Sequence, residues 1–355
     1  MNWLLIFIPI TAALEYVFHA GDALTFISAA LSIIPIAAMM GEATENLAVK
    51  TGPTIGGLLN ATFGNATELI IAFFALKAGK IDVVKASITG SMIGNMLLVL
   101  GLALFLGGLK FQKQVFSKET AGALSSLLVI VMIAFLVPAL FDFTERADGV
   151  SPTQIISSDA HFSLAASFVL IGLYICNMLF SLVTHKDLIS ASDDEHEGPA
   201  WPVGRAVGTL LVSTLVVAWL SEVLVGSLEG FSKGLGLSEV FAGLIIIPIV
   251  GNAAEHSASV FAVKNKLDIS IQIALGATIQ IALLVAPALV IMSFLIGQPM
   301  DLVIHRPLEL AGLVGATLIT ASVSRDGETN WLEGAMLLGV YLLLAVAFFY
   351  LPIGV

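Results

Sequence analysis

Two short stretches of the chain repeat each other: GNATE at residues 64–68 and GNAAE at residues 251–255. The match extends outward, because FALK at residues 74–77 corresponds to FAVK at residues 261–264 with the same spacing. Each stretch ends in a glutamate and lies inside a long apolar run. The chain therefore contains an internal repeat that carries one acidic motif in each half.

The apolar runs around the two motifs are long enough to cross a membrane. Of 355 residues, 58% are hydrophobic and 12% are charged, and the mean hydropathy is +1.00. A soluble domain carries about 25% charged residues, so this composition excludes a soluble enzyme, a disordered chain and a nucleic-acid-binding protein. The runs are continuous over about 20 residues and lack the alternation of a transmembrane barrel. The expected spans are residues 3–19, 24–47, 53–78, 82–108, 119–141, 161–184, 203–229, 238–264, 268–296, 305–324 and 331–351.

These spans predict an all-α polytopic membrane protein with about 11 transmembrane helices. Residues 1–23 form an extra first helix, residues 24–184 and 203–355 form two repeats of five helices, and residues 185–202 form an acidic cytoplasmic linker. Because five is an odd number, the second repeat enters the bilayer from the opposite side. The arrangement is therefore an inverted-topology repeat.

The positive charges predict the orientation. Cytoplasmic loops usually hold the excess of Lys and Arg, and nine of the 15 lie on the side of the N-terminus. These nine are Lys50, Lys110, Lys113, Lys118, Lys186, Arg205, Lys264, Lys266 and Arg325. The first apolar run lacks the basic start and cleavage site of a signal peptide, so we expect it to be retained. We expect a prokaryotic cell membrane protein with a cytoplasmic N-terminus.

Glu68 and Glu255 stand in the middle of apolar spans. A charged side chain at the bilayer centre costs at least about 2.5–3.5 kcal/mol, so each carboxylate needs a partner or an aqueous cavity. Asn65 and Asn252 precede them by three residues, which puts amide and carboxylate on the same helix face. Pro248 also removes a backbone donor upstream of the second motif, which favours a local helix break. The alternative is a protonated glutamate that only joins helices, and the symmetry of the two motifs disfavours it.

Two later spans carry further polar side chains at helical spacing. Ser91 and Asn95 share one face of the span at residues 82–108, and Gln280 lies in the span at residues 268–296. Serines in membrane helices often only join helices, whereas buried amides without partners are costlier. The predicted metal ligands are therefore Glu68, Glu255, Asn65, Asn252, Gln280 and Asn95.

An all-oxygen ligand set favours calcium. Ca²⁺ takes about 6–8 oxygen ligands in flexible geometry, whereas Zn²⁺ or Cu²⁺ prefers His or Cys. Two buried carboxylates repel each other, so without a cation at least one of them should be protonated. Ca²⁺ and H⁺ then compete for Glu68 and Glu255. If only the neutralised states cross the membrane cheaply, exchange of Ca²⁺ for protons follows, and no permanently bound cofactor is needed.

The two motifs closely resemble those of the Ca²⁺/H⁺ exchanger (CAX) family of the calcium/cation antiporter superfamily. The resemblance also includes GEATE at residues 41–45 and the Gly52-Pro53 pair, and it spans nearly the whole chain. It implies a bundle of one plus five plus five helices. It also implies that Glu68 and Glu255 bind Ca²⁺ near the midplane and exchange it for H⁺, and that Asn65, Asn252 and Gln280 line the site.

The chain departs from the family pattern at one place. Gly90-Ser91 in the first half corresponds to Gly276-Ala277 in the second, so a hydroxyl ligand is missing there. Sodium-driven relatives usually carry extra hydroxyl and acidic ligands beside the motif acids, and Thr67 is the only such residue beside Glu68. Proton coupling is therefore preferred, with a sodium-coupled exchanger as the alternative. A cation channel or an intramembrane enzyme is a remote alternative.

Several other polar residues are candidates for an access pathway to the ion site. Glu42, Glu222 and Glu229 could line the entrances to the site, or be interfacial carboxylates. Ser91 belongs with them, and His256 could relay protons or be a packed histidine. The acids of the linker could sense Ca²⁺, although a run of like charges is usually a solvated loop. The expected partners are Ca²⁺, H⁺ and the lipid bilayer, with no nucleic acid, and a homo-oligomer is compatible with the sequence.

Overall fold

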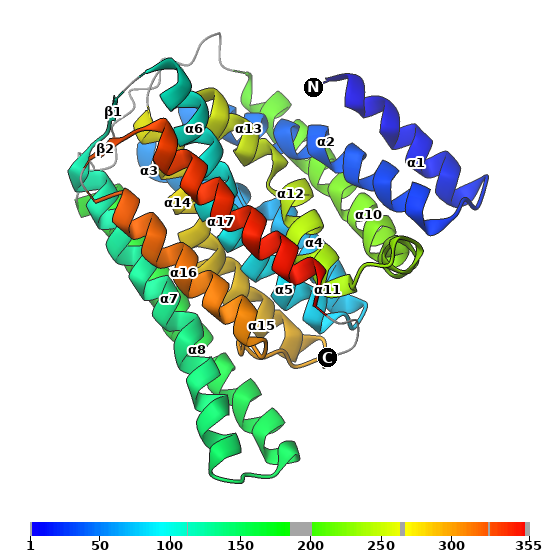
Figure 1. Ribbon diagram of the computed structural model, residues 1–355. Coiled ribbons are helices and arrows are strands. Elements are labelled where there is room, and N and C mark those ends of the chain that lie inside the picture. Colours follow the sequence, from blue (N-terminus) through cyan, green and yellow to red (C-terminus); the bar gives the residue numbers. More distant parts are fainter. Residues whose placement is uncertain (1, 112, 185–200, 263–266, 326, 352–355) are drawn as a thin grey trace. The chain divides into compact units, whose positions relative to one another are not determined.

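The chain is almost entirely helical (Figure 1). The computed structural model describes residues 2–111, 113–184, 201–262, 267–325 and 327–351. In the first half the helices are η1 (Asn2–Ile6), α1 (Phe7–Tyr16), α2 (Asp22–Thr51), α3 (Pro53–Phe63), α4 (Ala66–Lys77), α5 (Ile81–Ile93), η2 (Gly94–Val99), α6 (Leu100–Lys110), α7 (Lys118–Ala147), α8 (Pro152–Leu179) and η3 (Phe180–Thr184). In the second half they are α10 (Val203–Leu235), α11 (Glu239–Phe241), η4 (Ala242–Ile246), α12 (Ile247–Gly251), α13 (Ala253–Ala262), α14 (Leu267–Gln280), η5 (Ile281–Val285), α15 (Ala286–Leu295), α16 (Pro307–Val323) and α17 (Trp331–Phe349).

Strands are confined to one short pair within the described ranges. β1 (Gln114–Val115) and β2 (Glu328–Thr329) are antiparallel, with Gln114 opposite Thr329. Every other regular element is a helix, as the sequence predicts.

Seven helical segments of the described residues are long and apolar enough to cross a membrane, or eight if a bent pair is one span. Two shorter apolar helices, Trp3–Tyr16 and Pro307–Val323, accompany them. The chain is a multi-pass helical membrane protein, which confirms the predicted fold class. The total of eleven spans stays a prediction. We expect the acidic linker at residues 185–202, of which residues 185–200 lie outside the described residues.

The largest difference from the expected boundaries is in α7 and α8. The apolar pattern predicts an end at residue 141 and a new start at residue 161, whereas α7 continues to Ala147 and α8 begins at Pro152. These additional turns contain ionisable side chains that a hydropathy argument assigns to a loop. Opposite charges pair there at helical spacing, as with Arg146 and Asp142, and such pairs favour the helix.

The chain forms two compact units, each built from both halves of the sequence. The first consists of Met1–Ser87, Ser192–Ala254 and Phe349–Val355, and the second of Ile88–Ala191 and Glu255–Phe348.

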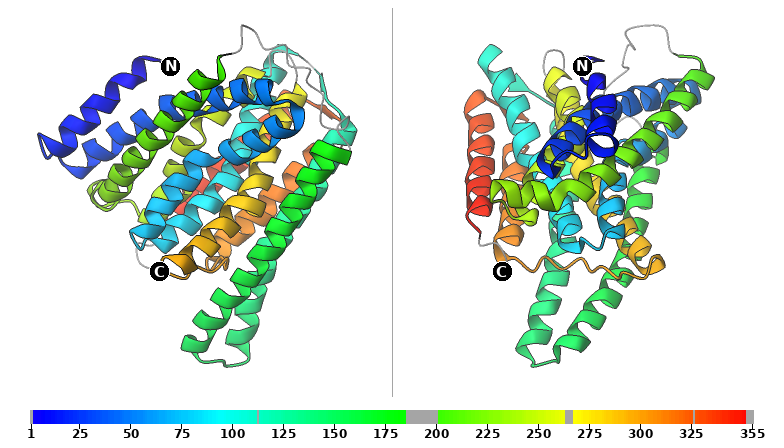
Figure 2. Two further views of the ribbon diagram at one scale, coloured as in Figure 1. Left: turned by 180° about the vertical axis from the view of Figure 1, so that it is seen from behind. Right: turned by 90° about the vertical axis from the view of Figure 1, so that its right-hand side faces the viewer.

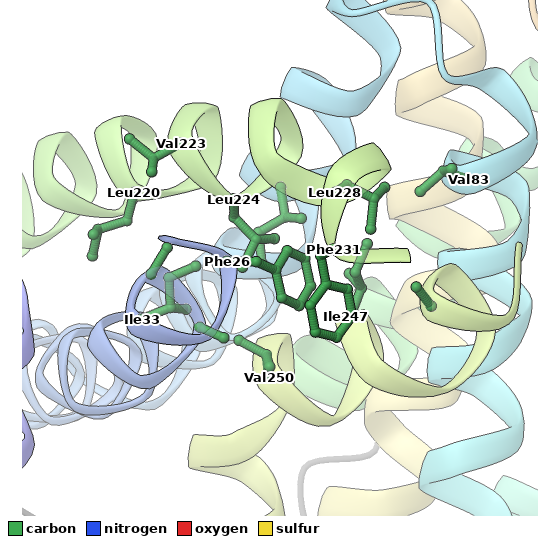
Figure 3. Packing of buried hydrophobic residues seen from close by; sticks show 14 residues of the cluster. Phe26, Ile33, Val83, Leu220, Val223, Leu224, Leu228, Phe231, Ile247 and Val250 are labelled. Atoms are coloured by element: carbon green, nitrogen blue, oxygen red, sulfur yellow. The ribbon is translucent and has the colours of Figure 1, made fainter. Parts of the chain in front are cut away.

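The first unit is built on α2 and α10, which pack along each other. Figure 3 shows Phe26 of α2 stacked on Phe231 of α10, with the ring centroids 4.0 Å apart. Ile247 and Val250 of α12 complete this apolar cluster, so the helix before the second motif is held against α2. Burial of these side chains is the main stabilising contact that positions α12.

The second unit contains the helices from η2 to α8 and from α14 to α17. α7 and α8 lie side by side as a hairpin, which Figure 2 shows in green. α14 packs against η2, α6 and α7. α6 and α17 approach closely, since a Cβ atom on Gly108 would collide with the backbone of Trp331 and one on Gly334 with the backbone of Phe105. Small residues are therefore required at this helix crossing.

Candidate ion-binding site

Both acidic motifs interrupt a helix at their asparagine. α3 ends at Phe63 and α4 begins at Ala66, with Asn65 at φ −100° and ψ 22°. α12 ends at Gly251 and α13 begins at Ala253, with Asn252 at φ −87° and ψ 10°. The helix directions on either side of Asn252 differ by 59°. The break that Pro248 favours is therefore present, four residues after the proline.

The breaks put the two glutamates at equivalent places. Glu68 is the third residue of α4, and Glu255 is the third residue of α13. The first turn of a helix has backbone N–H groups without helical partners, and its partial positive charge favours an anionic side chain. Each acid thus lies in the first turn of a helix.

Glu68 is buried without a polar partner. The residue is 9% exposed. Both of its carboxylate oxygens are enclosed and accept no hydrogen bond from another residue among those described. A buried ionised carboxylate that lacks partners is strongly unfavourable.

The side chain of Glu68 lies against the second motif. A Cβ atom on Gly251 would be 3.5 Å from both Cγ and Oε1 of Glu68. Within the first unit, α4 and α12 thus bring the acid of one motif to the glycine of the other. A larger residue at position 251 would occupy the space beside the carboxylate.

The motif asparagines of the first unit are both buried, with Asn65 2% exposed and Asn252 1% exposed. The Nδ2 group of Asn252 donates to the carbonyl oxygen of Pro248 at 2.9 Å. Asn65 makes no side-chain capping bond to α4. Both amides are thus buried in the same unit as Glu68, and within the described ranges no three His, Cys, Asp or Glu side chains form a metal cluster.

The second unit holds the other predicted ligands. Asn95 is 1% exposed and its Nδ2 atom has no hydrogen-bond partner among the described residues, while Ser91 is 4% exposed. Gln280 and Glu255 are half-buried. The structure therefore brings Glu68, Asn65 and Asn252 into one unit and the remaining predicted ligands into the other.

Two π-helical turns occur at corresponding places in the two halves, and sequence reasoning missed them. η2 contains Asn95, and η5 begins directly after Gln280. π-Turns inside α-helices are frequent at functional sites. In η2 the carbonyl of Met96 accepts a hydrogen bond from Thr320 at 3.3 Å. No residue type in these segments demands a π-turn, so no sequence signal announces them.

The predicted access residues are less enclosed. Glu42 and Glu222 are exposed on α2 and α10. Glu229 is also exposed, and it pairs with Lys233 at 2.5 Å and with Lys80 at 4.0 Å. His256 is half-buried, and its Nε2 atom has no partner within the described part of the chain.

Two hydroxyl groups lie next to positions that bear on the choice of coupling ion and of ligands, those of Thr67 and Thr278. The hydroxyl of Thr67, the residue that bears on sodium coupling, lies 4.0 Å from Sδ of Met40. Next to Ala277, which lacks a hydroxyl, Thr278 donates to the carbonyl of Ala274 at 3.0 Å. In these contacts neither hydroxyl binds Glu68 or Glu255.

Known proteins match this chain over nearly its whole length. The family model described as sodium/calcium exchanger protein matches residues 22–183 and 205–350. The "Ca(2+)/H(+) antiporter" of Aphanothece halophytica is 46% identical, with 99% of this chain and 96% of that protein covered. The "Ca(2+)/H(+) antiporter ChaA" of Bacillus subtilis is 44% identical, with 94% of each chain covered. The solved structure of native YfkE is 39% identical with a TM-score of 0.83, over 98% of this chain and 100% of that one.

Proposed function

Because the chain belongs to the sodium/calcium exchanger protein family, we propose that it is a secondary active transporter that exchanges Ca²⁺ for H⁺. Two relatives that cover nearly the whole chain carry the name Ca²⁺/H⁺ antiporter. The observation that carries the proposal is the buried carboxylate of Glu68, which lacks a polar partner and lies against Gly251.

In this proposal Glu68 and Glu255 bind either one Ca²⁺ or protons. Two ionised carboxylates carry a charge of −2, which one Ca²⁺ or two protons neutralise. Empty ionised carboxylates would have to cross the membrane interior at high cost, so the protein changes its access side only with Ca²⁺ or H⁺ bound. Obligatory exchange follows from this electrostatic condition.

The remaining ligands are neutral oxygen donors. Asn65 and Asn252 stand at the helix breaks, and Asn95 and Gln280 stand in or beside the π-turns. With bidentate carboxylates and water, these side chains reach the six to eight oxygens that Ca²⁺ prefers. Ca²⁺ is the cargo here, and no permanently bound cofactor takes part.

Alternating access uses the two five-helix repeats, residues 24–184 and 203–355, with residues 1–23 as an extra helix and 185–202 as a linker. Matching helix breaks at Asn65 and Asn252 and matching π-turns η2 and η5 support this division. Inverted repeats present one site to either side of the membrane in turn. Glu42, Glu222, Glu229, Ser91 and His256 lie along the routes to it.

The protein resides in a prokaryotic cell membrane with its N-terminus in the cytoplasm. The distribution of Lys and Arg supports this orientation. In that orientation it removes Ca²⁺ from the cytoplasm while protons enter.

Transport in proteoliposomes tests the proposal. The purified full chain should accumulate Ca²⁺ when a pH gradient is imposed in sodium-free buffer. Glu68→Gln should lose this uptake, and Glu119→Gln, an exposed acid at the start of α7, should retain it. Uptake that requires sodium would replace the proposal with a sodium-coupled exchanger. Uptake without any counter-ion would replace it with a channel.

A further inference from the structure

The additional turns of α7 and α8 hold a second set of buried carboxyl groups. Asp142 of α7 is 7% exposed and Asp159 of α8 is 2% exposed. Both belong to the second unit, in the part of the hairpin that extends past the apolar runs. Neither residue belongs to the acidic motifs, and the proposed exchange does not use them.

Arg146 identifies which of the two carboxyl groups is ionised. Its Nε atom donates to both oxygens of Asp142, at 2.9 Å and 2.8 Å, and its Nη2 atom lies 2.7 Å from Oδ1. A bidentate guanidinium contact of this kind requires an acceptor carboxylate. Asp142 is therefore the ionised member.

Ser158, the neighbour of Asp159 in α8, donates to Glu145 of α7, so this turn of α8 faces α7, and the carboxyl groups of Asp142 and Asp159 interact there. Two carboxyl groups can share a hydrogen bond only when one of them holds a proton. Oδ1 of Asp159 is enclosed and has no hydrogen-bond partner among the described residues. An ionised Asp159 would thus combine a buried orphan oxygen with repulsion from Asp142, whereas a protonated Asp159 donates to it.

The surrounding charges also favour the proton. Asp301, from the loop between α15 and α16, and Glu145 of α7 both act on Asp159 as like charges. His305 lies 3.8 Å from Asp301, and Glu309 of α16 is engaged with Arg306 at 3.1 Å. η5 and α15, which pack against α8, contribute no charged side chain. Arg146 contacts Asp142 directly and neutralises one negative charge, and His305 acts on Asp142 as a further positive charge when it is protonated.

We propose that Asp142 and Asp159 form a proton-binding carboxyl pair, separate from the two motif glutamates, with the shared proton held by Asp159. With the proton bound, the group of Asp142, Asp159 and Arg146 is electrically neutral. The ligand is a proton because Arg146 already neutralises Asp142, so that one further positive charge makes the group neutral.

The shared proton joins α7 to α8 at the end of their hairpin. Ser158 of α8 donates to Glu145 of α7 at 2.6 Å, next to the pair. Ser163, one turn further along α8, accepts a hydrogen bond from the backbone of Leu302 at 2.9 Å. The pair thus lies between a hydrogen bond from α8 to α7 and one from the α15–α16 loop to α8, and loss of its proton would place two like charges across the hairpin.

Infrared spectroscopy of the purified full chain tests this assignment. The experiment uses the Glu68→Gln/Glu255→Gln background, so that the motif glutamates contribute no carboxylic acid band and the result does not depend on transport. At neutral pH we expect a carboxylic acid C=O band that shifts when aspartate is labelled with ¹³C. Asp159→Asn should remove this band, and Asp148→Asn, an exposed acid in the turn after α7, should leave it unchanged.

Two results would overturn the proposal. One is a spectrum in which no carboxylic acid band shifts on aspartate labelling. This spectrum is recorded on a chain that retains Asp159, so the result does not depend on whether the Asp159→Asn variant folds. The other is removal of the band by added Ca²⁺ at constant pH, which would make the pair a cation site.

Discussion

The carboxylate of Glu68 lies directly beside Gly251, where a Cβ atom would be 3.5 Å from Oε1. These residues come from different acidic motifs. Glu68 is the last residue of the first pentapeptide, and Gly251 is the first residue of the second. The contact is ordinary in length, so a methyl group would fit without displacing the glutamate. It would nevertheless occupy the space beside the carboxylate, where the ion binds in our proposal.

Gly251→Ala should therefore separate transport from stability. We expect Ca²⁺ uptake to fall about tenfold, which corresponds to about 1.4 kcal/mol, while the thermal unfolding temperature stays nearly unchanged. Gly172→Ala on α8, where a Cβ would meet nothing within 4 Å, is the control and should transport normally. Normal uptake by Gly251→Ala would show that the space beside Glu68 is not used by the ion.

Ca²⁺ should stabilise the folded chain through Glu68. At a Ca²⁺ concentration about 100 times Kd, a ligand that binds only the folded state adds about 2.7 kcal/mol. We expect a rise in the thermal unfolding temperature for the natural chain and almost none for Glu68→Gln. The variant itself should fold, because glutamine removes a buried ionisable group that has no polar partner. An equal calcium-induced rise in both proteins would remove Glu68 from the site.

Calcium binding should weaken as the pH falls. Protons and Ca²⁺ compete for the same carboxylates, so the apparent affinity decreases wherever binding must displace protons. If two protons are displaced, the loss approaches about 100-fold per pH unit, and with one it approaches about tenfold. Calorimetric titration at several pH values measures this slope. A pH-independent affinity would contradict shared occupancy of Glu68 and Glu255.

The crossing of α6 and α17 should depend on Gly334. A Cβ there would overlap the backbone of Phe105, which cannot move aside as a flexible side chain would. Gly334→Ala should destabilise the protein by about 1–3 kcal/mol through overpacking. Gly339→Ala, on the same helix but with nothing within 4 Å of a Cβ, should be neutral or slightly stabilising. Thermal unfolding in detergent compares the two, and equal stabilities would argue against this crossing.

The carboxyl pair of the α7–α8 hairpin should tolerate amide substitution unequally. Asp159→Asn retains a donor toward Asp142 and should change stability little. Asp142→Asn removes the carboxylate that Arg146 contacts with two nitrogens and should cost about 1–3 kcal/mol. Thermal unfolding of both variants at neutral pH checks the order, and a larger loss for Asp159→Asn would reverse our assignment of the proton.

Part of the proposed site could be predicted because each motif acid is a charged residue within an apolar segment. Glu68 and Glu255 stand among apolar residues, and the cost of a charge in lipid marks them without any knowledge of the fold. The resemblance to Ca²⁺/H⁺ exchangers is confirmed by the family match together with the relatives that carry that name. The roles of Asn65, Asn252, Asn95 and Gln280 as calcium ligands stay predictions.

The helix boundaries of α7 and α8 were predicted less well. Hydropathy assigned Asp142 and Asp159 to a loop because each would be costly in a helix at membrane depth by itself. Their cost is reduced by each other and by Arg146, and this pairing across two helices has no signal in a single apolar run.

The sequence by itself determined the membrane class, the helical segments and the two motif acids, because these follow from local hydropathy, composition and desolvation cost. Tertiary structure alone decided that Glu68 meets Gly251, that π-turns follow the motifs, and that Asp159 reaches Asp142. Each of these features depends on packing between different helices. Its free energy is therefore set by the side chains of the neighbouring helix and not by the local sequence.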